Sequence, residues 1–257
     1  MQSACKGKGF TLVELIMVIL ILAIVSIGTT SFLQFGITIY QDNVNRDRQI
    51  GDSRFLIERL TRELREAMPN SVRVSNSCIE FAPIVASSSY ISLPVFPDKL
   101  DNALLVTPQQ TGGNKLVIYP LSPQEVYADN LLSQGKVFPI TQFNDLGNNQ
   151  LEVSFANDKS FSQHSPNSRY FIVDDAVSYC VDGTTIKRYS GYWPTATQQS
   201  PPAVNGVLMA KQQTNPAPFE YHQDSLLRHA VIQLNLSFGY EDEVLNLYHE
   251  VHIVNVP

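Results

Sequence analysis

The chain opens with a long apolar run that carries a single charge. From Phe10 to Tyr40 the only charged residue is Glu14. About twenty apolar residues are enough for a helix to cross the hydrocarbon core, and this run is much longer than the apolar part of a cleaved secretory signal. Lys6 and Lys8 precede it, so the positive-inside rule keeps the N-terminus in the cytoplasm and sends the rest of the chain across the membrane.

After Tyr40 polar residues enter, and the pattern becomes that of an amphipathic helix. Apolar residues recur at helical spacing; they are Ile50, Leu56, Ile57, Leu60, Leu64 and Met68. Pro69 should end the helix at or before Met68. Opposite charges four residues apart predict ion pairs on the exposed surface; the pairs are Glu58–Arg62, Arg59–Glu63 and Arg62–Glu66.

A continuous helix from Phe10 to Met68 would be about 88 Å long at 1.5 Å per residue, far longer than a bilayer core is thick. We therefore expect residues 10–40 to lie in the membrane and residues 41–68 to pack under a globular head. Glycines are the weak points at which such a helix could bend; they are Gly28, Gly36 and Gly51.

Beyond Pro69 the pattern predicts strands. Short alternating or apolar runs occur at 72–74, 78–84, 116–121, 151–155 and 170–173. Asp182-Gly183 is a favoured two-residue turn and predicts a hairpin between the strands on either side of it. Residues 198–218, rich in Pro, Gln and Asn, are expected to form a long surface loop.

The C-terminal segment alternates apolar and polar residues, which predicts an antiparallel pair with one buried face. The inward positions are Ile232, Leu234, Leu236 and Phe238 on one strand, and Leu245, Leu247, Val251 and Ile253 on the other. The predicted fold class is therefore α+β, with a long N-terminal helix packed against an antiparallel β-sheet head of residues 69–257.

Composition excludes several classes of function. The net charge is −6, which leaves no basic footprint for nucleic acid. Neither a P-loop, a dinucleotide fingerprint nor a GxSxG elbow occurs, so we expect no enzyme activity and no cofactor. His249 and His252 lie three apart on a predicted strand and therefore on opposite faces, so we expect a partly buried His249 and no metal site.

The chain has three cysteines. Cys78 and Cys180 fall in predicted strands on the far side of the membrane, where an oxidising periplasm permits a disulfide. Such a bond would close a loop of about a hundred residues and contribute up to roughly 4–5 kcal/mol in the chain-entropy view. Two separate buried thiols are the alternative. Cys5 precedes the apolar run.

Glu14 is the residue that a plain membrane anchor does not explain. A carboxylate within a membrane helix costs roughly 2.5–3.5 kcal/mol and usually has a function and a partner. The stretch around it, GKGFTLVELIMVILILAIV, resembles the class III signal of type IV pilins and type II secretion pseudopilins. In that family a membrane-bound prepilin peptidase cuts after a glycine and methylates the new N-terminal residue, and the fifth mature residue is a glutamate.

The resemblance implies a role for three residues. Residues 1–9 are the leader, Gly9 precedes the cut, Phe10 becomes the methylated N-terminus, and Glu14 is the assembly glutamate. In the family, that glutamate meets the N-terminal amine of a neighbouring subunit. The implied partners are the prepilin peptidase, other major and minor pilins, and the inner-membrane assembly platform. The implied location is the bacterial inner membrane, with a periplasmic head, and later the pilus.

Local strings beyond the signal narrow the resemblance. RLTRELREAMPNSVRV, SYCVDGTTIKRYSGY and HEVHIVNVP resemble the large minor pilins of the mannose-sensitive haemagglutinin (MSHA) pilus, a cell-adhesion fimbrium. This implies a low-copy structural subunit in priming or at the tip. Two alternatives are a large-headed type II secretion pseudopilin and a membrane-anchored periplasmic binding protein or enzyme.

Overall fold

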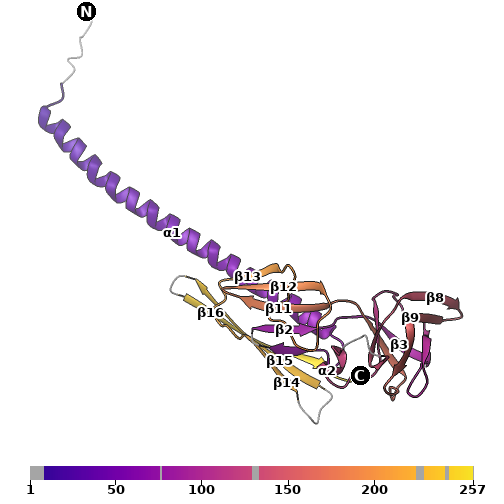
Figure 1. Ribbon diagram of the computed structural model, residues 1–257. Coiled ribbons are helices and arrows are strands. Elements are labelled where there is room, and N and C mark those ends of the chain that lie inside the picture. Colours follow the sequence, from indigo (N-terminus) through magenta and orange to yellow (C-terminus); the bar gives the residue numbers. More distant parts are fainter. Residues whose placement is uncertain (1–8, 76, 129–132, 224–228, 241–242, 257) are drawn as a thin grey trace, which may run out of the picture. The chain divides into compact units, whose positions relative to one another are not determined.

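A computed structural model describes residues 9–75, 77–128, 133–223, 229–240 and 243–256 (Figure 1). The chain forms two compact units, residues 1–51 and residues 52–257, which we call the N-terminal unit and the globular unit. The helix α1, Leu12–Arg65, runs through both. The second helix, α2, is the short segment Pro123–Val126.

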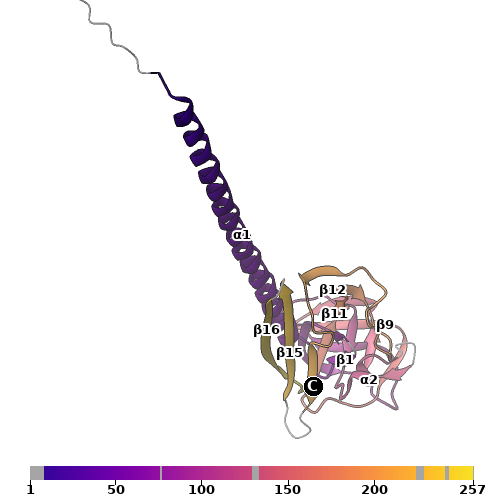
Figure 2. The same cartoon turned by 90° about the vertical axis from the view of Figure 1, so that its left-hand side faces the viewer.

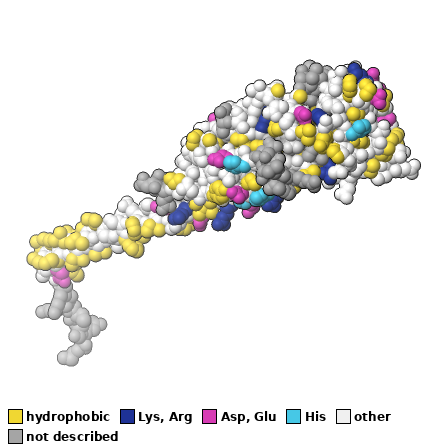
Figure 3. Space-filling view, turned by 90° about the horizontal axis from the view of Figure 1, so that it is seen from below, with side chains coloured by type: hydrophobic (Ala, Val, Ile, Leu, Met, Phe, Trp, Pro, Cys, Tyr) yellow, Lys and Arg dark blue, Asp and Glu magenta, His cyan; other side chains and the backbone are white. Residues whose placement is uncertain are grey.

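The part of α1 in the N-terminal unit exposes nearly consecutive apolar residues and so presents them on all sides; Figure 3 shows one face of them. It contains a stretch long and apolar enough to cross a membrane. Its hydroxyl groups bond to the helix's own backbone: Thr29 donates to the carbonyl of Val25 at 2.9 Å, and Thr30 to that of Ser26 at 2.8 Å. Because these hydroxyls are satisfied locally, they add little to the cost of an apolar environment.

The C-terminal end of α1 is joined to the following strands by backbone hydrogen bonds. The helix was predicted to end at or before Met68, and α1 ends at Arg65. The amide of Met68 donates to the carbonyl of Ala82 at 2.8 Å, and the amide of Ile84 donates to that of Glu66 at 2.8 Å. These bonds draw the backbone out of helical geometry before Pro69 can act.

Two sheets enclose the last turns of α1 within the globular unit, and Figure 2 shows strands of both beside the helix. One has the order β1-β2-β11-β12-β13 and the other the order β14-β15-β16. The first comprises β1 (Arg73–Ser75), β2 (Cys78–Phe81), β11 (Ala176–Asp182), β12 (Thr185–Tyr192) and β13 (Val207–Lys211). The second comprises β14 (Phe219–Gln223), β15 (His229–Tyr240) and β16 (Glu243–Val254).

The core between these two sheets is built on one face of α1. Its buried positions are Ser53, Leu56, Leu60 and Leu64, one or two per turn. The three leucines pack in a single cluster with residues such as Tyr179 of β11 and Leu234 of β15. The predicted helical stripe is therefore the surface on which both sheets are assembled.

A third sheet forms its own lobe on the side of the globular unit away from β16 (Figure 1). Its order is β6-β9-β4-β3-β10-β5-β7, with β8 also paired to β9. The strands are β3 (Ile84–Ser92), β4 (Leu100–Val106), β5 (Lys115–Val117), β6 (Gln134–Gly135), β7 (Val137–Pro139), β8 (Gln142–Gly147), β9 (Gln150–Phe161) and β10 (Arg169–Val173). The aromatic side chains of Phe138, Phe155 and Phe161 meet edge to face in its core.

The predicted α+β class is confirmed, with a long N-terminal helix followed by sheets that are antiparallel except for the parallel pair β6–β9. The prediction of an uninterrupted loop over residues 198–218 is wrong, because β13 lies inside it. Gly206, just before β13, explains why the strand fits: a Cβ there would lie 2.6 Å from the Tyr189 ring. Glycine allows this close approach.

The predicted hairpin forms, but its turn is shifted by one residue. Asp182 pairs with Thr185, so the two residues between the strands are Gly183 and Thr184. The hydroxyl of Thr185 donates to the carbonyl of Asp182 at 2.9 Å, and Lys187 Nζ lies 2.6 Å from the Asp182 carboxylate. These contacts hold Asp182 in the strand.

The pairing pattern predicted that Glu63 lies on the exposed surface, but the Glu63 side chain is largely buried. Arg59 Nε lies 3.1 Å from its carboxylate, but Arg188 Nε of β12 is equally close at 3.0 Å. The hydroxyl of Tyr179 on β11 donates to the same carboxylate at 3.0 Å. Burial, and then the charge of Glu63, raise the pKa of Tyr179 well above its usual value. Glu63 therefore ties α1 to two strands.

Truncation of the buried stripe should destabilise the globular unit far more than truncation of the exposed face. Leu60 is fully buried, so Leu60→Ala should lower the free energy of unfolding by about 2–5 kcal/mol. Phe55 on the same helix is 54% exposed, and Phe55→Ala should change the free energy of unfolding by roughly 0.5 kcal/mol or less. Urea unfolding of the full chain in detergent measures both, and equal losses would contradict this packing.

Candidate functional site

The first residues of the described chain form an exposed N-terminal segment followed by a capped helix. Gly9 is exposed and Phe10 is 78% exposed, so the bond between them is open to an enzyme. Thr11 immediately precedes α1, and its Oγ1 accepts a hydrogen bond from the backbone amide of Glu14 at 3.3 Å. Thr11 is thus the N-cap, in the Thr-x-x-Glu pattern of a capping box.

Glu14 lies in the first turn of α1, where the helix dipole favours a negative charge. Within the part of the chain that the structure describes, no ion pair involves its carboxylate. Lys6 and Lys8 lie outside the described residues. The carboxylate is exposed and available to a partner. Glu14 can therefore have two roles: it can stabilise the start of α1, and it can make a contact with another subunit.

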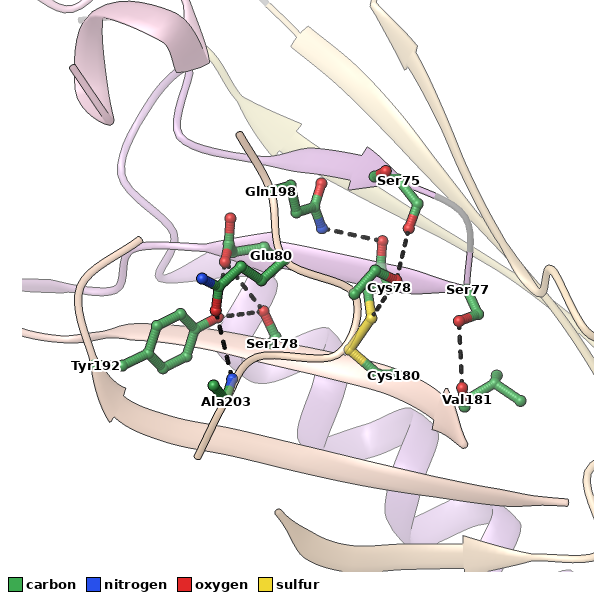
Figure 4. Close-up of a disulfide and its surroundings, with 12 residues drawn as sticks. Ser75, Ser77, Cys78, Glu80, Ser178, Cys180, Val181, Tyr192, Gln198 and Ala203 are labelled. Atoms are coloured by element: carbon green, nitrogen blue, oxygen red, sulfur yellow. Dashed lines mark hydrogen bonds between the residues drawn. A yellow bond between two sulfur atoms is a disulfide. The ribbon is translucent and has the colours of Figure 1, made fainter. Parts of the chain in front are cut away.

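Cys78 and Cys180, the pair expected to bond, form a disulfide in the structure. They face each other directly across β2 and β11, with Cα atoms 4.1 Å apart and both side chains fully buried (Figure 4). The bond spans 102 residues of sequence. Cys5 lies outside the described residues.

The segment after β12 passes over the disulfide, as Figure 4 shows. Gln198 Nε2 donates to the carbonyl of Cys78 at 3.3 Å, and the hydroxyl of Ser200 lies 2.9 Å from Cys78 Sγ. The same hydroxyl donates to the carbonyl of Ser75 at 3.3 Å. These contacts cover the bond with ordered chain.

A buried carboxylate next to the disulfide was not predicted from the sequence. Glu80 is fully buried in β2, and its carboxylate accepts from Arg73 Nε at 2.5 Å and from the Tyr192 hydroxyl at 2.7 Å. Arg73 also donates to the carbonyls of Thr195 and Ala196, at 2.9 and 2.8 Å. The signal was present, since Glu80 is the single charge in the run CIEFAPI. Buried ionised groups need such partners.

The histidines of β16 occupy opposite faces, as their spacing predicted. His249 is half-buried and His252 is exposed. Within the residues that the structure describes, no group of three or more His, Cys, Asp or Glu side chains is placed to hold a metal ion. His249 instead faces a cavity against α1, which is considered below.

Comparison with known proteins identifies the N-terminal segment. The family model for the prokaryotic N-terminal methylation motif matches residues 5–30. No curated protein and no solved structure matches the chain. The matched residues contain Gly9, Phe10, Thr11 and Glu14. The chain thus carries the class III signal of a type IV pilin-like or pseudopilin precursor, and its membrane-capable helix is consistent with anchoring in the inner membrane.

A pair of variants distinguishes the two roles of Glu14, at the start of the helix and in an intersubunit contact. Glu14→Ala should leave cleavage largely intact but strongly reduce incorporation into pili, because an unpaired amine in an apolar bundle is costly. Thr11→Ala removes only the cap, which is worth about 1 kcal/mol, and should incorporate far better. Immunoblots of sheared pili and of whole cells measure incorporation and cleavage. Equal incorporation of Glu14→Ala and the native chain would contradict the intersubunit contact.

The buried tyrosines should make the globular unit sensitive to alkali. Burial and the charge of Glu80 raise the pKa of Tyr192, as burial and Glu63 raise that of Tyr179. The unfolded chain loses these protons near pH 10 while the folded chain keeps them. Their stabilising effect is therefore full below about pH 10 and is lost as pH rises through the raised folded values.

Tyr192→Phe should make this decline shallower, although it lowers stability at neutral pH by about 1–3 kcal/mol because Glu80 loses a donor. Urea titrations from about pH 8 to about pH 11 measure the slope. A decline as steep as that of the native chain would show that Tyr192 does not keep its proton.

Proposed function

We propose that the protein is the precursor of a minor type IV pilin of an MSHA-type pilus. The prepilin peptidase cuts between Gly9 and Phe10 and methylates the new amine of Phe10. The single observation that carries the prepilin part of the proposal is the methylation motif at residues 5–30, which runs into a helix able to cross a membrane. The narrower MSHA part rests on the resemblance of the local sequence strings given above. The exposed segment before the Thr11 cap suits this processing.

Assembly moves the helix from one apolar environment to another. The N-terminal unit first lies in the inner membrane and then joins a bundle with the helices of other pilins. Cleavage creates a new amine at Phe10, and no ion pair involves Glu14 among the described residues. A pair between the amine of one subunit and Glu14 of another satisfies both charges and fixes the register.

A low-copy position, in priming or at the tip, fits the size of the globular unit. It comprises residues 52–257 and carries a complete additional sheet lobe besides the sheets that pack on α1. We place this unit in the periplasm before assembly, where its disulfide is stable. The proposed role is structural, with no catalytic activity and no cofactor.

A large-headed type II secretion pseudopilin is the second candidate, because the methylation motif is shared by both systems. Deletion of the gene separates them. Loss of surface pili and of adhesion supports the minor pilin, whereas exoproteins retained in the periplasm support the pseudopilin.

The mass of the mature protein tests the shared premise. Mass spectrometry of the protein from its host should give residues 10–257 plus one methyl group, and the host lacking prepilin peptidase should give the uncut chain. An N-terminus at Met1 in a peptidase-positive host would overturn both pilin proposals and favour a membrane-anchored binding protein or enzyme.

A further inference from the structure

A cavity lies between α1 and β16 within the globular unit. Its volume is about 450 Å³, and it is lined by α1 side chains from Ile57 to Glu66 and by His249 of β16. The lining includes two arginines, Arg62 and Arg65, and two glutamates, Glu58 and Glu66. The function proposed above uses none of these residues.

Two of the residues that line this cavity each carry an unsatisfied polar atom. Thr61 Oγ1 and His249 Nε2 are both buried and have no hydrogen-bond partner. Among the described residues four buried side-chain atoms are in this state, and the other two belong to Thr107 and Ser160. Buried polar atoms are normally paired. The convergence of two such atoms, from a helix and from a strand, on one cavity indicates an occupant that supplies their bonds.

The charges around the cavity select the kind of occupant. Thr61 and Arg65 are four residues apart and so lie on one row of α1, and Arg65 takes part in no ion pair within the described part of the chain. The hydroxyl, the guanidinium and a protonated Nε2 of His249 are all donors. Three such donors can bind an anion, and a carboxylate matches the planar guanidinium.

The neighbouring row of α1 shows that the anion should belong to a protein. Glu58, Arg62 and Glu66 follow one another at spacings of four, so two carboxylates line the same cavity. Two like charges oppose any anion, and they oppose a doubly charged ion such as phosphate more strongly than a singly charged carboxylate. They favour a single carboxylate carried on a segment whose own basic residues meet Glu58 and Glu66.

We propose that this cavity receives the carboxylate of an Asp or Glu side chain from a neighbouring pilin subunit, bound by Thr61, Arg65 and His249. The inference rests on the proposed function, because it needs a neighbour in the filament. It adds a second intersubunit contact, in the globular unit, to the one made by Glu14.

Acetate is the probe for the chemistry of the site. In NMR spectra of the mature full-length chain in detergent, sodium acetate should shift the His249 imidazole and the Thr61 amide saturably, whereas sodium chloride at equal ionic strength should not. Arg65→Gln should weaken acetate binding about tenfold, which corresponds to about 1.4 kcal/mol. Arg54→Gln, on α1 outside the cavity, should bind as the native chain does.

Three results would overturn the site itself. They are an absent acetate response, an equal response in Arg65→Gln, and a stronger response to sodium phosphate than to acetate. Thr61→Val keeps the shape of the side chain and removes only the hydroxyl, so it provides a second variant if Arg65→Gln is poorly folded. It should also lower the acetate affinity.

Incorporation in cells tests the source of the carboxylate. Arg65→Glu should be cleaved normally but reach sheared pili at about a tenth of the native level, whereas Arg54→Glu should reach them normally. An Asp or Glu to Lys change in another pilin subunit should restore Arg65→Glu. Normal incorporation of Arg65→Glu would overturn the inference, while absence of the native chain from pili would count against the proposed function and leave the acetate result standing.

Discussion

Burial of one narrow stripe of α1 is the constraint on which the globular unit depends. Leu56, Leu60 and Leu64 are fully enclosed, and both the five-stranded and the three-stranded sheet pack on them. In the globular unit the buried stripe occupies only one side of α1. In the N-terminal unit the same helix presents apolar side chains on every side. A single helix thus changes from a membrane pattern to an amphipathic pattern without a break in its hydrogen bonds.

The polar interior fixes how the sheets meet the helix. Glu63 joins α1 to β11 and β12, and Glu80 joins β2 to the segment that covers the disulfide. Buried carboxylates are costly to desolvate and add little net stability, but a displaced partner leaves an uncompensated charge. Such groups therefore penalise alternative packings. Both carboxylates accept a hydrogen bond from a tyrosine hydroxyl and pair with an arginine, so the two networks are built from the same three types of side chain.

The parts of the fold that the sequence predicted are those with local causes. The helical spacing of apolar residues predicted the buried leucines of α1. The alternation of apolar and polar residues predicted the inward residues of β15 and β16. Pairings between distant segments, such as β3 with β10, have no local signature, so the third sheet was not foreseen. β13 was missed because its residues lie within a segment rich in Pro, Gln and Asn. At the N-terminus, FTLVE shows the processing residues directly, whereas the cavity at Thr61 exists only once β16 lies beside α1.

The position of the disulfide has a mechanical consequence. Every strand of the third sheet lies between Cys78 and Cys180 in sequence, so the whole lobe is a closed loop whose two ends are covalently joined at its base. Tension that enters through α1 and β2 passes across the S–S bond into β11 without travelling through the lobe. A subunit that is pulled by its helix can therefore carry a large lobe that lies outside the covalent path of the load. Insertions within that loop can change the lobe's surface without lengthening the path along which force is transmitted.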